Sequence, residues 1–163
     1  MVDFVLVSSA IAAATSAVGL IDKIWDQVER VTSGSSEGDI PREHRQKIQK
    51  EGDAIVSRIQ GQVYQTITAQ DFEKLPEADL EHIKVLEQSM NNHYAVWASV
   101  YPQLALAVDP IAKAKTEAQL KGVVVEMKKD LTAVLDFLQH SGLYLDDHYM
   151  RIRNVVGELA AAA

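Results

Sequence analysis

The metal-binding capacity of this chain rests on five histidines, which are His44, His82, His93, His140 and His148. Helical metal sites use pairs such as His-Glu-x-x-His, or a Glu-x-x-His motif from each of two helices, and neither pattern occurs here. Asp136 lies four residues before His140, and His148 follows soon after, so these three are weak candidates for metal ligands. A histidine in the last turn of one helix, followed by the acidic start of the next, explains the same residues without a metal. We therefore expect no metal and no cofactor.

Groups for covalent catalysis are equally sparse. Cysteine is absent, which removes a thiolate nucleophile, a disulfide framework and a Cys-based zinc site. Gly34 and Gly38 lie in a Ser-rich stretch, but no Lys-Ser or Lys-Thr follows them, so no phosphate-binding loop is predicted. His93 lies beside an apolar stripe and is predicted to be a hydrogen-bonded, partly buried histidine. We expect a protein that is not an enzyme, with a helical enzyme built on the three metal candidates as the last alternative.

The charge and composition of the chain argue against some classes of binding partner. The 163 residues carry a net charge of −7, and no segment is strongly basic, which argues against nucleic acid as a partner and makes electrostatic docking on anionic lipid unfavourable. The lack of cysteine fits a reducing compartment, so we expect a cytoplasmic location. A small-molecule ligand is neither indicated nor excluded.

Hydrophobic periodicity predicts helices through most of the chain. The first is expected from Val2 to Val31, with a loop over residues 32–40 after it. The second is expected from about Pro41 onward, with an apolar stripe made of Ile48, Ile55, Ile59, Val63 and Ile67. No alternating strand pattern is long enough to predict a sheet.

Three further helices follow in this interpretation. One runs from about Glu77 to Tyr101, where Pro102 is expected to kink or end it. The next begins near the capping box Thr116-Glu-Ala-Gln and ends at His140. The last runs from about Asp146 to Leu159.

These elements predict an all-α fold, a single compact four-to-five-helix bundle with an apolar N-terminal helix. One domain is expected over residues 1–160. The four alanines at 160–163 are either native helix or the remnant of an expression tag, which would make this the first domain of a longer protein.

The N-terminal segment is unusual because Phe4 to Ile21 contains no charged residue. Small residues between its bulky ones allow helices to approach closely, either in a soluble bundle or in a bilayer. The segment is therefore either a helix covered by the rest of the bundle or a releasable helix that inserts into a membrane or assembles with copies of itself. Its bulky residues are Phe4, Val5, Leu6, Val7, Ile11, Val18, Leu20 and Ile21.

Two stretches of this helix, Phe4-Val-Leu-Val-Ser-Ser-Ala-Ile and Val18-Gly-Leu-Ile-Asp-Lys, together with the length of the chain, resemble the HeLo-like domains. Those domains are N-terminal helical bundles of cell-death and NLR-type immune proteins. The resemblance implies a membrane-perturbing or self-assembling effector that acts through the first helix and associates with membranes on activation.

The leading hypothesis is a non-catalytic interaction or regulatory module that binds another protein or a second copy of itself. Tyr94, Trp97 and Tyr101 share one face of a predicted helix. They are expected to pack in the core, and an exposed aromatic patch for a partner is the alternative.

Overall fold

The computed structural model describes residues 3–31, 40–156 and 159. The predicted alanine tail and most of the predicted loop over 32–40 lie outside these residues. Three long helices, three short strands and several short helices make up the described part. In chain order they are α1 (Phe4–Val31), a 3₁₀ turn (Arg42–His44), β1 (Lys47–Glu51), β2 (Ala54–Ile59), β3 (Gln62–Ile67), α2 (Ala69–Glu73), α3 (Glu77–Leu106), α4 (Pro110–His140) and α5 (Asp147–Val155).

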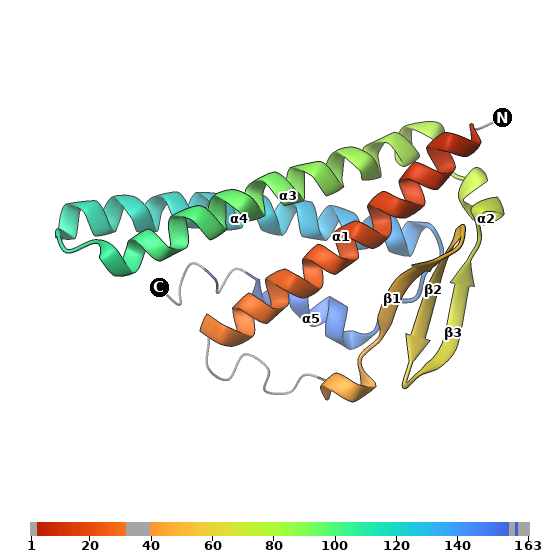
Figure 1. The fold of residues 1–163 in the computed structure, drawn as a ribbon, viewed down its shortest axis with the longest axis horizontal. Coiled ribbons are helices and arrows are strands. Elements are labelled where there is room, and N and C mark those ends of the chain that lie inside the picture. Colours follow the sequence, from red (N-terminus) through yellow and green to blue (C-terminus); the bar gives the residue numbers. More distant parts are fainter. Residues whose placement is uncertain (1–2, 32–39, 157–158, 160–163) are drawn as a thin grey trace.

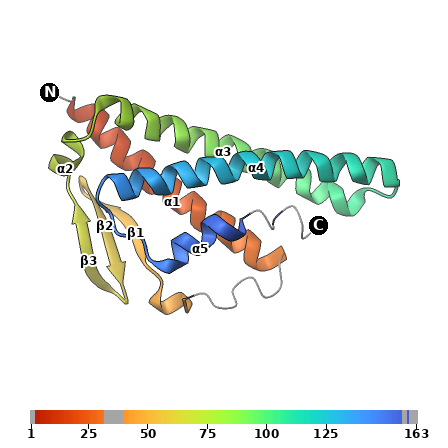
Figure 2. The same cartoon turned by 180° about the vertical axis from the view of Figure 1, so that it is seen from behind.

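The three long helices pack against one another. α3 and α4 run antiparallel as a hairpin, and α1 crosses them obliquely (Figures 1 and 2). α1 lies against α3 along much of its length, with the sheet and α5 on its other sides. The expected helical content and the apolar N-terminal helix are therefore confirmed.

The predicted second helix is wrong, because residues 47–67 form a three-stranded antiparallel sheet in the order β1-β2-β3. The fold is thus not purely α, nor is it a single bundle. The expected stripe still faces inward in part, since Ile48, Ile55 and Ile67 are buried in the core. β-Branched residues favour strands over helices, and this segment is rich in them.

Two tight turns decide the sheet. Gln60 and Gly61 form the two-residue link between β2 and β3, and both have positive φ values, 53° and 81°. This is the backbone of a type I′ turn, whose twist matches that of the flanking strands. Gly52, with φ at 61°, serves the link between β1 and β2. A continuous helix through 41–67 would have to pass both glycines, at a cost of about 1 kcal/mol each.

Two predicted helix boundaries are also wrong. α3 continues through Pro102 to Leu106, since proline costs one backbone hydrogen bond but the helix is held along its length by α4. α4 begins at Pro110, six residues before the predicted Thr116. Asp109 caps it by accepting a hydrogen bond from the backbone N–H of Ile111 at 3.2 Å.

The two extended boundaries lengthen the hairpin. Its far end, with the link 107–109, projects beyond every other described element (Figures 1 and 2). We call residues 104–112 the arm tip. At the other end of α4, the predicted stop at His140 is confirmed, with Gly142 at φ 100°, and α5 starts behind an Asp146 cap as expected.

Candidate functional site

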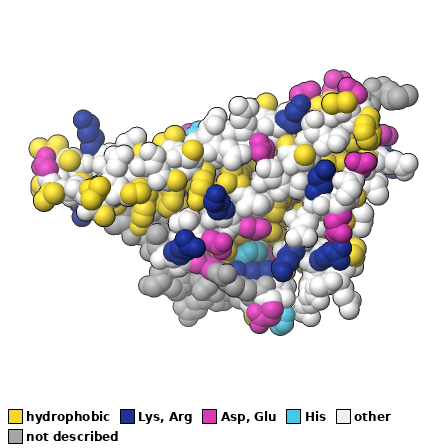
Figure 3. Space-filling view, viewed as in Figure 1, with side chains coloured by type: hydrophobic (Ala, Val, Ile, Leu, Met, Phe, Trp, Pro, Cys, Tyr) yellow, Lys and Arg dark blue, Asp and Glu magenta, His cyan; other side chains and the backbone are white. Residues whose placement is uncertain are grey.

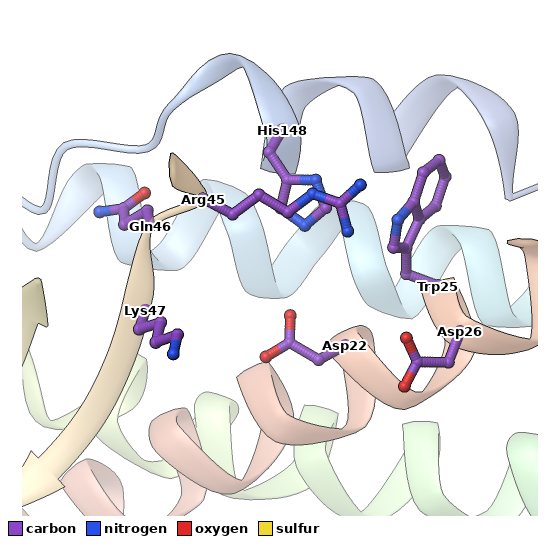
Figure 4. A pocket seen from close by; sticks show the side chains of 7 residues that line it. All are labelled: Asp22, Trp25, Asp26, Arg45, Gln46, Lys47 and His148. Carbon is purple, nitrogen blue, oxygen red and sulfur yellow. The ribbon is translucent and has the colours of Figure 1, made fainter. Parts of the chain in front are cut away.

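A polar pocket lies where α1, the start of β1 and α5 meet. Its volume is about 270 Å³. Figure 4 shows two carboxylates rising from α1 towards a guanidinium and an imidazole on the opposite side. The lining residues are Asp22, Trp25, Asp26, Arg45, Gln46, Lys47 and His148.

Asp22 carries the strongest electrostatic perturbation in this pocket. Neighbouring protein atoms surround the Asp22 carboxylate, although the residue as a whole is exposed to solvent. This local burial raises the pKa of the carboxyl to about 6. The Tyr149 hydroxyl donates a hydrogen bond to Asp22 at 3.1 Å and opposes the rise, and Asp26 adds to it. Tyr149 is itself buried, and this burial, together with the Asp22 charge, raises the pKa of its hydroxyl well above the usual value. The pair is therefore a phenol that stays protonated and a carboxyl that titrates near pH 6.

The other polar groups of the pocket fasten chain segments to one another. Gln46 bonds reciprocally with Asp146, its backbone N–H donating to the carboxylate and its side-chain oxygen accepting from the Asp146 N–H, both at 3.0 Å. Its amide also donates to Ser57 at 2.7 Å. Arg45 pairs with Glu29 at 3.2 Å. These contacts tie the segment before β1 to α1, to β2 and to the start of α5, so these polar groups help to hold the fold together.

A Ser-His-Asp cluster bridges α3 and α4, which sequence reasoning did not predict. His93 Nδ1 lies 2.6 Å from Asp130 Oδ2, and the Ser89 hydroxyl donates to the same carboxylate at 3.1 Å. In a catalytic triad the histidine stands between the other two, with the nucleophile at the nitrogen that does not face the acid. Here both Ser89 and Asp130 meet Nδ1. The arrangement is a hydrogen-bonded clasp between helices, and the predicted partly buried histidine is found there.

The three weak metal candidates lie in separate environments. Asp136 pairs with Arg153 at 2.6 Å, and His140 faces Asp79 at 3.7 Å. His148 is buried edge-on against Trp25, with ring centroids 5.8 Å apart. Within the part of the chain that the structure describes, no group of three potential ligand side chains could hold a metal ion.

The segment Gly34-Ser-Ser-Glu-Gly38 matches the Gly-x-Ser-x-Gly pattern of a nucleophile elbow, the strand-to-helix turn that carries the serine of many hydrolases. The elbow needs a strand before it, whereas helix α1 ends at Val31. Residues 34–38 lie outside the described residues.

The predicted membrane segment is placed in the interior for most of its length. Phe4 and Val5 are exposed, while the other six residues proposed for membrane insertion are buried. They are Leu6, Val7, Ile11, Val18, Leu20 and Ile21. By length and hydropathy, Phe4–Arg30 is able to span a membrane, and half of its most apolar window is buried against the rest of the protein.

The aromatic face of α3 is also partly covered. Trp97 is buried and stacks between Tyr94 and Tyr101, with ring centroids 6.1 and 4.8 Å away, and both tyrosines are half-buried. Lys23 of α1 lies 5.5 Å from the Tyr94 ring, a cation–π distance. The stack thus packs at the junction of α1 and α3.

Among the described residues, the three most exposed large hydrophobic side chains lie at the arm tip. Leu106 is 77% exposed, Val108 96% and Ile111 78%. Figure 3 shows hydrophobic atoms gathered at this projecting end. Sequence reasoning missed these residues. The available signal was the run from Leu104 to Ala112, which contains a single charged residue beside a helix-starting proline.

No protein-family model, curated protein or solved structure matches this chain. The HeLo-like resemblance accordingly stays a prediction.

Proposed function

We propose that this protein is a non-catalytic interaction module whose docking surface is the arm tip. The observation that carries the proposal is the exposure of Leu106, Val108 and Ile111 together at one projecting end. Scattered exposed aliphatic residues are ordinary, but a contiguous cluster marks an interaction site. Burying one such side chain contributes about 1.5–3 kcal/mol, which in a complex offsets part of the entropy lost on association.

The architecture supports the same role. α3 and α4 pack against each other through buried residues that include Val100, Leu104, Leu120 and Val124. This packing keeps the projecting hairpin rigid. The rest of the protein, or the body, which contains the sheet, α1 and α5, packs against the other end of the hairpin. Many polar groups of the pocket and of the Ser89–His93–Asp130 cluster, by contrast, bond to neighbouring protein groups.

The alternative in which α1 is released to act on membranes requires much more rearrangement. Its buried face includes Ile11, Ala14, Val18, Ile21 and Trp25, each at most 1% exposed. Removing α1 would uncover the faces of α3, the sheet and α5 at once. The arm tip needs no such change.

Site-specific photo-crosslinking in living cells tests the proposal whatever the partner is. A benzoylphenylalanine placed at Val108 is expected to give an adduct on irradiation, with a protein or with a lipid, which intact-mass spectrometry detects in either case. The same group at Val85 is expected to give none. Val85 is 62% exposed on α3 but lies 23 residues from Val108 along the chain, so it is a matched control. The adduct should vanish in the double variant Leu106→Glu/Ile111→Glu. Equal labelling at both positions, or none at Val108, would overturn the proposal.

A further inference from the structure

The surface of the arm tip is almost without charge. From Gln103 to Ala112 the only charged residue is Asp109, and its carboxylate accepts the capping hydrogen bond from Ile111. On the α3 side no Lys, Arg, Asp or Glu occurs between Asn91 and Val108. Little charge would therefore lose its hydration if this end left water.

Basic residues stand directly behind that apolar end. Lys113 and Lys115 are exposed on the first turns of α4, and Lys121 follows two turns later. With a rise of 1.5 Å per residue, Lys115 lies about 6 Å behind Ile111 along the helix axis. Interfacial helices bury their apolar groups about 5–10 Å below the headgroup boundary, and lysine stems extend towards the interface while they bury their methylenes.

We propose that the arm tip inserts as a shallow wedge into an anionic lipid surface, with Lys113 and Lys115 at the level of the lipid phosphates. The inference rests on the proposed function, since it names the partner of the same docking surface. Leu106, Val108 and Ile111 form the wedge, and Asp109 limits its depth to the interfacial region.

The shape of the surface favours lipid over a protein groove. The apolar residues occupy the projecting end of a hairpin (Figures 1 and 3), and a fluid lipid interface accommodates a convex wedge without a preformed complementary cavity. Between Asn91 and Val125 three lysines outnumber two carboxylates, although the whole chain carries −7.

The net negative charge of the chain does not oppose this docking. It resides outside residues 91–125, and the run from Asn91 to Leu106 spans about 22 Å of helix at 1.5 Å per residue. The Debye length at physiological ionic strength is about 8 Å. An arm that touches the membrane end-on therefore holds the acidic body beyond the range of the surface potential.

Vesicle co-sedimentation of the full chain tests the inference. The protein is expected to bind vesicles of phosphatidylcholine with 30% phosphatidylglycerol and to bind pure phosphatidylcholine much more weakly. Leu106→Glu/Ile111→Glu should weaken binding by at least about tenfold. The matched control Val85→Glu/Val125→Glu adds the same two charges at exposed valines outside the tip and should bind far more strongly than the tip variant.

The lysines have their own control. Lys113→Gln/Lys115→Gln should weaken binding by about fivefold for each lysine, and Lys128→Gln/Lys129→Gln, on the same helix but closer to the body, should have a smaller effect. Because the chain has no cysteine, Val108→Cys can carry a single environment-sensitive dye. Its emission should shift to the blue on anionic vesicles, and a dye at Val85→Cys should not shift.

The outcomes separate the two proposals. Binding that is insensitive to the tip variant, or a dye shift at Val85 alone, overturns the wedge. No binding to any vesicle, together with a Val108 photo-adduct on a protein in cells, overturns the lipid inference and keeps the docking module. No vesicle binding and no Val108 adduct overturns both. A helical circular dichroism spectrum for each variant excludes loss of fold as the cause.

Discussion

Burial and the hydrogen bond from Tyr149 together determine the pKa of Asp22. The folded protein holds the Asp22 proton with a pKa of about 6, against 3.8 for the free side chain. The folded state thus binds this proton more tightly than the unfolded chain does. Its stabilising effect is full below about pH 4 and is lost as the pH rises through 6.

Replacing Asp22 by Asn should remove that pH dependence. Asn keeps an oxygen that accepts the Tyr149 hydroxyl but carries no charge to be buried. We expect the stability of Asp22→Asn relative to the wild type to rise between pH 4 and pH 7. Urea unfolding midpoints of both proteins at pH 4, 5, 6 and 7 measure the difference, in which the other carboxyls largely cancel. Parallel curves would show that Asp22 does not titrate in this range.

The Ser89–His93–Asp130 clasp predicts an order of stabilities. Asp130 is buried and serves both partners, so Asp130→Ala leaves two polar groups without their acceptor. We expect a loss of about 1.5–3 kcal/mol for Asp130→Ala and about 0.5–1.5 kcal/mol for Ser89→Ala in urea unfolding. If Ser89 were instead a nucleophile, Ser89→Ala would abolish an esterase activity that Asp130→Asn only slowed.

At the scale of elements, the β2–β3 turn and α4 place glycines in opposite situations. Gly61 has a φ of 81°, and Gly122 sits in the helical backbone of α4 with no atom within 4 Å of an added methyl group. Gly61→Ala should cost about 1–2 kcal/mol, because a side chain strains the left-handed backbone. Gly122→Ala should raise the free energy of unfolding by about 0.5–1 kcal/mol, because alanine loses less backbone entropy in a helix than glycine does.

Thermal or urea unfolding of the two glycine variants checks the opposite signs. Residual strand signals in the infrared spectrum would show whether Gly61→Ala loosens the sheet alone. A stabilised Gly61→Ala protein would contradict the sheet turn and revive the helix predicted over this segment.

At the scale of the whole molecule, α1 is the common packing partner of α3, the sheet and α5. Ala17 is fully buried on this helix, whereas Ala12 is exposed. Ala17→Glu should destabilise the protein by more than about 3 kcal/mol, because a charge enters the core without a partner. Ala12→Glu should change stability by less than about 0.5 kcal/mol.

The same pair tests α1 as a releasable membrane helix. Packing alone predicts that Ala17→Glu unfolds more easily and that neither variant alters dye release from liposomes. Leakage by the wild type that both variants abolish while remaining folded would instead favour the HeLo-like effector.

The sequence by itself determined the long helices. Stripes with steps of three and four, such as Leu120 to Leu138, have no strand equivalent over that length, and caps at Asp146 and Gly142 act through local hydrogen bonds. It also indicated that α1 would be apolar on most sides. Helical periodicity and helix caps depend on residues a few positions apart in the chain, so they can be predicted from the sequence alone.

Tertiary structure decided the rest. The steps of four from Ile55 to Ile59 to Val63 to Ile67 suit a helix of period 3.6 and also return to one face of a strand of period two, so periodicity alone could not choose. The sheet was selected by packing on α1 and by turns at Gly52 and Gly61. The clasp joins Ser89 and Asp130, 41 residues apart, and depends on how α3 and α4 align.

The arm tip is the strongest example. Leu106, Val108 and Ile111 are ordinary core residues by type, and their exposure follows from two facts of the whole molecule. α3 passes Pro102, and the hairpin therefore extends beyond the end of α1 and the body (Figure 1). Composition defines which residues are apolar, but only the relative lengths and positions of the packed elements define which of them remain uncovered.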